Sequence, residues 1–171
     1  ADLNPCTLPR LPLPDGEVDL PETAVYQTLL PAELVSQLNQ IAQQAAVPLK
    51  SVLLAAHLKM LGFVCGQNEV VSGLVMNGRT EQSGSERALG LFLNTVPFRQ
   101  TLAAGSWIDL IKQTFATETA LLPYRQFPLA EIQQMLGGRP LFEVPFNFLN
   151  FHVLASLGED QIKIVDYRSF G

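Results

Sequence analysis

The sequence predicts an α/β or α+β fold, in which helices are laid on a β-sheet. Short apolar runs rich in β-branched residues alternate along the chain with segments whose apolar positions recur at helical spacing. Hydrophobic residues make up 47% of the 171 residues and charged residues 16%, a globular balance tilted to the apolar side. A chain of this length can bury a substantial core as one domain.

The first third of the chain predicts a linker, a strand and two helices. Residues 1–21 contain five prolines, a spacing that favours extended chain. An alternating pattern predicts a strand over Ala24–Leu30. Pro31 fits the first turn of an amphipathic helix that continues to Ala45. A second helix, Leu49–Cys65, is apolar nearly all round, so we expect it to be buried on most sides.

His57 lies inside the second helix and is expected to be a core or rim histidine with one satisfied nitrogen. No histidine or carboxylate stands three or four residues further on, so the spacing of a metal site is missing. Cys65 and a cysteine in the linker permit one disulfide but predict nothing firm. The plain inference is a reducing cytoplasm.

The stretch from Val70 to Arg99 predicts a strand, a long polar loop and a second strand. Asn77-Gly78 ends the first strand, and Gly90 precedes the second. Alternation puts Phe92, Asn94, Val96 and Phe98 on one face of the second strand and Thr95 on the other. Pro97 indicates an edge, a bulge or a strand end.

Asn94 and Thr95 are a polar pair inside an apolar strand, and two interpretations are open. They could satisfy the neighbouring loop by hydrogen bonds, because buried polar groups are usually paired. They could instead face a ligand passage, because a few polar groups on an apolar wall give a pocket its selectivity.

The remaining third predicts two helices and two strands. Ser106 begins a helix with a start like a capping box, in which Asp109 replaces the usual Glu or Gln. A short helix is expected over Leu129–Leu136. Strands are expected over Phe142–Phe151, which contains Asn147 as another polar residue, and over Gln161–Val165.

Several classes of function are disfavoured by what the sequence lacks. The net charge is −5 and no basic run occurs, so nucleic acid is not an expected partner. No segment approaches 18 uninterrupted apolar residues, so no membrane span is expected. Phosphate-binding loops, a nucleophile elbow and Cys/His clusters are also absent from the sequence.

Three stretches together resemble the condensation domains of nonribosomal peptide synthetases. The first combines Asn77-Gly-Arg, a loop, and Gly90-Leu-Phe-Leu-Asn-Thr-Val-Pro-Phe-Arg. The second is Leu122-Pro-Tyr-Arg-Gln-Phe-Pro-Leu-Ala-Glu-Ile, although Tyr124, Arg125 and Gln126 replace the family's usual opening and Leu129 its usual Phe. The third is Pro140-Leu-Phe-Glu-Val-Pro-Phe-Asn-Phe.

The resemblance implies half of a chloramphenicol-acetyltransferase-like α/β (α+β) sandwich, with a mixed sheet and helices packed on it. Residues 1–21 would be the Pro-rich linker between two lobes, and residues 22–171 an incomplete C-terminal lobe. The family's reactive His-His-x-x-x-Asp-Gly motif does not occur. We therefore expect no catalytic residue in this chain, no metal site, and a missing N-terminal lobe as its partner.

The function that the resemblance implies is amide-bond formation between a carrier-bound acyl thioester and a carrier-bound amine. The cofactor would be phosphopantetheine delivered by carrier proteins, with none bound covalently here. Asn94, Thr95, Phe92, Arg79 and Asn147 are the candidates for the tunnel or the seam between lobes. Two alternatives remain open: a sibling acyltransferase or epimerisation domain, and a non-catalytic module that binds carrier proteins or neighbouring domains.

Overall fold

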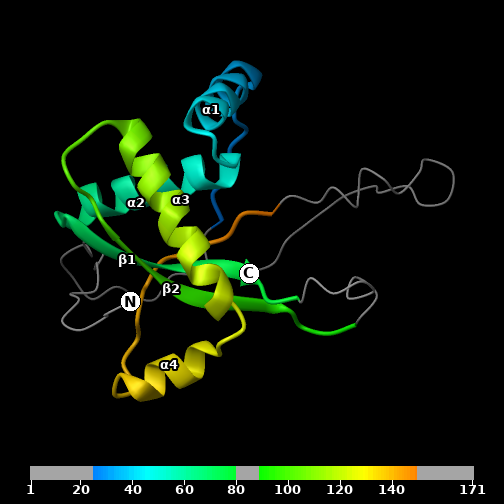
Figure 1. Ribbon diagram of the computed structural model, residues 1–171, viewed down its shortest axis with the longest axis vertical. Coiled ribbons are helices and arrows are strands. Elements are labelled where there is room, and N and C mark those ends of the chain that lie inside the picture. The colour runs from blue at the N-terminus through cyan, green and yellow to red at the C-terminus, as the bar shows by residue number, and fades with distance from the viewer. Residues whose placement is uncertain (1–24, 80–88, 150–171) are drawn as a thin grey trace, which may run out of the picture.

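The computed structural model describes residues 25–79 and 89–149 (Figure 1). Within these ranges helices and strands alternate, in the order α1 (Ala32–Ala45), α2 (Leu49–Cys65), β1 (Glu69–Asn77), β2 (Leu93–Thr101), α3 (Trp107–Leu121), the 3₁₀ helix η2 (Leu122–Tyr124), α4 (Leu129–Met135) and β3 (Pro145–Phe146). The predicted α/β class is confirmed. The predicted linker over residues 1–21 and the predicted strand over residues 161–165 lie outside the described residues.

The strands form one mixed sheet with the order β2-β1-β3. β1 pairs antiparallel with β2, with Gly73 opposite Pro97, and parallel with β3, with Gly73 opposite Pro145. β2 is therefore an edge strand of the described sheet, a position in which a proline is tolerated because its missing N–H costs no ladder hydrogen bond there. The mixed sheet that the resemblance implied is present.

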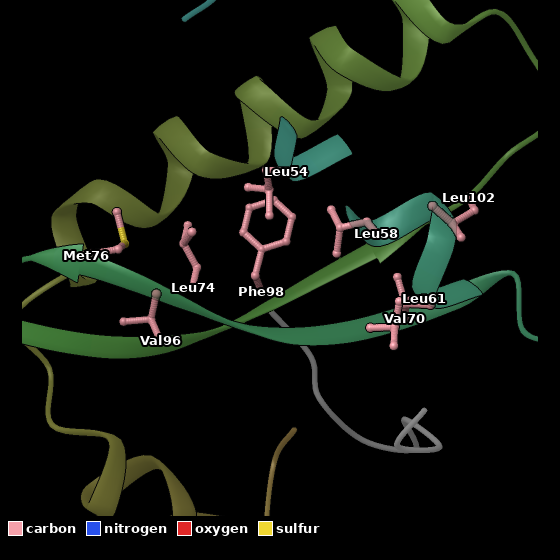
Figure 2. Packing of buried hydrophobic residues seen from close by; sticks show 9 residues of the cluster. All are labelled: Leu54, Leu58, Leu61, Val70, Leu74, Met76, Val96, Phe98 and Leu102. Atoms are coloured by element: carbon pink, nitrogen blue, oxygen red, sulfur yellow. The ribbon is translucent and has the colours of Figure 1, made fainter. Parts of the chain in front are cut away.

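The main core lies between the sheet and the helices that cover one of its faces (Figure 1). Its nine buried members come from α2, β1, β2 and the residue after β2; they are Leu54, Leu58, Leu61, Val70, Leu74, Met76, Val96, Phe98 and Leu102. Figure 2 shows the ring of Phe98 at the centre, pointing from β2 toward Leu54. Removing such apolar area from water supplies most of the driving force for folding.

A polar cluster joins α2 to α3 beside this core. Ser51 Oγ donates a hydrogen bond of 2.9 Å to Glu118 Oε2, and Lys50 forms an ion pair with the same carboxylate. Ser51 is fully buried and Glu118 is 7% exposed. Because a buried carboxylate is costly unless it is paired, these two partners are what allow Glu118 to lie between the helices.

The helix ends follow the predicted chemistry. Ser106 forms the expected capping box: its Oγ accepts from the Asp109 amide at 3.2 Å, and its own amide donates to Asp109 Oδ2 at 3.1 Å. The Ser106 hydroxyl also donates to Asp109 Oδ2 at 2.7 Å, and this bond, together with the one from the Ser106 amide, holds the pKa of the Asp109 carboxyl below its usual value. α2 ends at Gly66, whose φ of 63° lies in the left-handed region that glycine adopts without strain.

One predicted strand is wrong in the structure, and two others have different bounds. Residues Val25–Leu30 are in no regular element, and Val25, Tyr26 and Leu29 are exposed. A strand needs a neighbour to pair with, and the described residues provide none for this segment. Of the strand expected over Phe142–Phe151, the part described up to residue 149 forms a strand at Pro145–Phe146, where Pro145 has no N–H to donate to the ladder. The strand expected over Leu91–Arg99 is observed over Leu93–Thr101.

α2 is also less buried than its composition predicts. Its outer side leaves Met60 60% exposed and Phe63 81% exposed, with Val64 beside them. An all-round apolar helix is expected to be covered, so this face differs from the prediction for the described part of the chain. Among the described helices none alone is long and apolar enough to cross a membrane; α1 and α2 meet that test only together, bent by 101°.

Candidate functional site

The topology brings three chain segments to one edge of the sheet. β1 and β3 are parallel, so both end at this edge, and the antiparallel β2 begins there. An open groove of about 420 Å³ lies at this edge. Its lining consists of Val75, Met76, Asn77, Arg79, Gly90, Leu91, Phe92, Leu93, Asn147, Phe148 and Leu149. Sequence positions about 70 residues apart therefore share one site.

The groove has an apolar wall with a few polar groups set into it. Asn77 and Asn147 contribute amides and Arg79 a guanidinium, and no carboxylate is among the lining residues. The Arg79 guanidinium carbon lies 4.0 Å from the centre of the Phe92 ring, a cation–π contact. Such a lining suits an elongated ligand that carries apolar and amide portions and tolerates negative charge near Arg79.

Three of the five candidates from the sequence meet in this groove: Phe92, Arg79 and Asn147. Asn94 and Thr95 are not among its lining residues. The Asn94 amide donates to the carbonyl oxygens of Arg125 at 3.0 Å and Phe127 at 2.7 Å, so both of its N–H groups are hydrogen-bonded to the turn after α3. Thr95 is half-buried opposite Val75 in the sheet. A role for Asn94 or Thr95 in contacting a ligand stays a prediction.

The same turn braces the groove from outside, through residues that the sequence reasoning did not single out. Gln126 Nε2 donates to the Gly78 carbonyl at 2.7 Å, and the Arg125 guanidinium donates to the Arg79 carbonyl at 3.1 Å. The Gly78 amide donates to the Phe92 carbonyl at 2.6 Å. The available signal was the Leu122–Ile132 stretch, which carried part of the family resemblance.

His57 lies outside the groove and is satisfied as expected. Its Nε2 is 2.9 Å from Ser72 Oγ, and that hydroxyl donates to the Val144 carbonyl at 2.7 Å. Because the hydroxyl has one proton, Nε2 carries the hydrogen and donates to Ser72. The imidazole also contacts the Phe146 ring, with centroids 5.3 Å apart. Burial lowers the pKa of His57, which favours the neutral ring.

No group of three or more His, Cys, Asp or Glu residues in the described ranges is placed to hold a metal ion. The groove's polar groups are amides and a guanidinium, which hydrogen-bond organic ligands and are poor metal ligands.

Comparison with known proteins gives the family. A family model described as Condensation domain matches residues 4–168. The chain belongs to the condensation domain family. The resemblance inferred from the Asn77–Arg79 and Gly90–Arg99 stretches is thereby confirmed.

Relatives of this condensation domain chain are large synthetases. It is 40% identical over 129 residues to the AMB antimetabolite synthetase AmbE of Pseudomonas aeruginosa, covering 75% of this chain and 6% of that protein. It is 32% identical over 154 residues to the ferrichrome siderophore peptide synthetase of Mycosarcoma maydis, covering 87% of this chain and 4% of the relative. The chain thus spans a small part of the length of these relatives.

Solved structures show the same fold. The first condensation domain of the calcium-dependent antibiotic synthetase, in complex with a substrate analogue, matches with a TM-score of 0.61 at 21% identity. The match covers 66% of this chain and 26% of that one. The condensation domain of the Monacolin K polyketide synthase MokA matches with a TM-score of 0.60 at 17% identity. At these identities the likeness establishes the chloramphenicol-acetyltransferase-like architecture.

Proposed function

We propose that this chain contributes the C-terminal lobe to an amide-forming condensation domain of a nonribosomal peptide synthetase. The observation that carries the proposal is the groove, in which the Asn77–Arg79 turn, the start of the Gly90–Arg99 stretch and Asn147 share one wall. All three come from stretches that mark the family. The groove would be a wall of the passage through which carrier proteins deliver phosphopantetheine-bound substrates.

The size and lining of the groove support this assignment. A volume of about 420 Å³ falls in the usual range of small-molecule sites. The phosphopantetheine arm is long and narrow, with two amides and apolar methylenes and methyls. The Asn77 and Asn147 amides could hydrogen-bond the arm's amides, and Leu91 and Leu93 could pack against its carbons.

The chemical step would be left to residues outside this chain. Proton transfer to or from the attacking amine needs a group with a pKa near neutrality within hydrogen-bond reach. His57 is outside the groove lining, and its Nε2 is engaged by Ser72. We therefore expect the isolated chain to form no amide from carrier-bound substrates above the buffer rate, and activity to need a first lobe that carries the histidine motif.

Binding of pantetheine, followed by NMR on the purified chain, tests the groove assignment. Pantetheine should shift the amide signals of residues 91–93 and 147–149. The variant Leu93→Asp puts a charge in the lining at a residue that is 55% exposed, so it should abolish these shifts while leaving the fold intact. Leu122→Asp is the matched control, because Leu122 is 42% exposed and lies outside the lining.

Two results would contradict the proposal. Shifts that survive Leu93→Asp would mean that pantetheine binds elsewhere. Amide formation by the isolated chain would mean that it contains its own catalytic group. A phosphopantetheine-loaded carrier protein serves as a second probe, and should shift the same signals as pantetheine together with further surface signals.

Exposed apolar side chains are consistent with a partner lobe. Phe63 is 81% exposed, and Leu89 and Leu91 beside the groove are 100% and 90% exposed. Large apolar patches usually mark interaction surfaces. We expect the purified chain to self-associate, and sedimentation at increasing concentration measures this. A strictly monomeric chain at high concentration would count against a lobe that covers these residues.

A further inference from the structure

A closed circuit of hydrogen bonds links β2, the turn Arg125–Phe127 and the Asn77–Arg79 segment, part of which lines the groove. From β2, the Asn94 amide donates to the carbonyls of Arg125 and Phe127. From that turn, the side chains of Arg125 and Gln126 donate to the carbonyls of the Asn77–Arg79 segment. The circuit closes just before β2, where the Gly78 amide donates to the Phe92 carbonyl at 2.6 Å. Each connection joins segments that are distant in sequence.

The bonds converge on the backbone of one groove-lining segment. The carbonyls of Gly78 and Arg79 both accept from the turn. The amide of Gly78 donates to the carbonyl of Phe92, the residue before β2, and the amide of Arg79 donates to Asn77 Oδ1 at 2.9 Å. All four polar backbone atoms of these two residues are therefore held, although the segment follows the end of β1 and lies outside the ladder.

We infer that the turn Arg125–Phe127 is a positioning element that sets the shape of the groove. Gln126 is the exposed residue of this turn whose side chain holds the Gly78 carbonyl. The inference rests on the proposed function, since it assigns to the turn the task of orienting Arg79 and Phe92 for a pantetheine-bearing ligand. The side chains of Arg125 and Gln126 hold the backbone carbonyls of Arg79 and Gly78, and the turn itself does not line the groove.

A substitution at Gln126 can distinguish a role in positioning the groove from a role in overall stability. Its side chain is exposed and is not part of the main core. Its hydrogen bond to Gly78 is directed at the groove-lining segment alone. Loss of this bond should therefore free the 77–79 segment to move while the sheet and its core stay in place.

The experiment compares Gln126→Met with Gln134→Met in the purified chain. Both changes replace an exposed glutamine by a neutral side chain of similar length. Gln126 loses its hydrogen bond to the Gly78 carbonyl, whereas the described residues show no hydrogen bond from the Gln134 side chain. Gln126→Met should shift the NMR amide signals of residues 77–79 and 91–93, weaken pantetheine binding about threefold to tenfold, and leave the melting temperature unchanged. Gln134→Met should change none of these. Gln126→Glu, which keeps the shape but has no amide donor, should reproduce the effects of Gln126→Met.

Two outcomes would overturn the inference, and a third would overturn the proposed function alone. A lower melting temperature, with pantetheine affinity unchanged in the folded protein, would show that Gln126 is merely structural and would overturn the inference. Unchanged signals at residues 77–79 would overturn it as well. If the unmodified chain bound no pantetheine, the proposed function would fail. The positioning role would then still be decided, because the signals of residues 77–79 and 91–93 respond, or fail to respond, without any ligand.

Discussion

Replacing Asn94 by alanine tests whether this residue serves the fold or a ligand. The Asn94 amide makes hydrogen bonds of 3.0 and 2.7 Å to the carbonyls of Arg125 and Phe127. Each such bond contributes about 0.5–1.5 kcal/mol net, and Asn94 is half-buried, so the loss should be about 2 kcal/mol. For a chain of this size that corresponds to a fall of about 4–8 °C in the melting temperature.

The matched control is Asn39→Ala in α1. Asn39 also donates its amide to a backbone carbonyl, that of Val35 at 3.0 Å, but on an exposed helical surface. Alanine is the better helix former, which offsets the lost bond, so this variant should change stability by less than about 0.5 kcal/mol. Thermal and urea unfolding of the two variants give the comparison directly.

The opposite pattern would refute the reasoning. If Asn94 contacted a ligand in the passage, Asn94→Ala would weaken pantetheine binding while the melting temperature stayed the same. A melting temperature that falls no further for Asn94→Ala than for Asn39→Ala would show that the two carbonyl contacts contribute nothing to stability.

Three further changes should have measurable effects. Gly73→Ala should destabilise the fold by about 1–3 kcal/mol in urea unfolding, because a Cβ there would come within 2.4 Å of the Phe142 ring; an unchanged midpoint would mean that the ring moves freely. Arg79→Ala should lower the melting temperature more than Arg87→Ala, whose position lies outside the described residues, and equal melting temperatures would remove the claim. Burial lowers the pKa of His57 in the folded state below its ordinary value of 6.5, so the unfolded chain takes up a proton more readily as the pH falls. The folded state is therefore destabilised as the pH falls below 6.5. His57→Gln should reduce the loss of stability measured between about pH 7 and about pH 5, and an identical pH profile would contradict this.

The helices were predicted almost to the residue because their ends are encoded locally. Pro31 and Pro48 occupy the positions just before α1 and α2, Gly66 ends α2, and Ser106 with Asp109 begins α3. Each of these signals acts through the backbone of its own helix turn. The sequence therefore contains what is needed to place them.

Strands and the site depended on neighbours that local patterns do not specify. The Val25–Leu30 segment alternates like a strand, yet it has no pairing partner among the described residues. Alternation put Asn94 and Phe92 on one face of the predicted strand, but in the structure Phe92 precedes β2 and lines the groove, whereas the Asn94 amide bonds to the turn after α3. Periodicity gives the face of a strand, and tertiary packing decides what that face meets.

The pairing of β1 with β3 has a consequence for the order of folding. β2 begins 16 positions after β1 ends, whereas Ser72 and Val144, which are hydrogen-bonded at the β3 side, are 72 positions apart in the chain. Contacts between distant positions carry a larger entropic cost of closure and form late, and short edge pairings are among the first to open. The segment that brings Asn147 to the groove is joined to the sheet by two residue pairs, Gly73 with Pro145 and Leu74 with Phe146. The wall of the groove is thus completed by residues that are distant in the chain, and we expect this short parallel pairing to open before the longer pairing of β1 with β2.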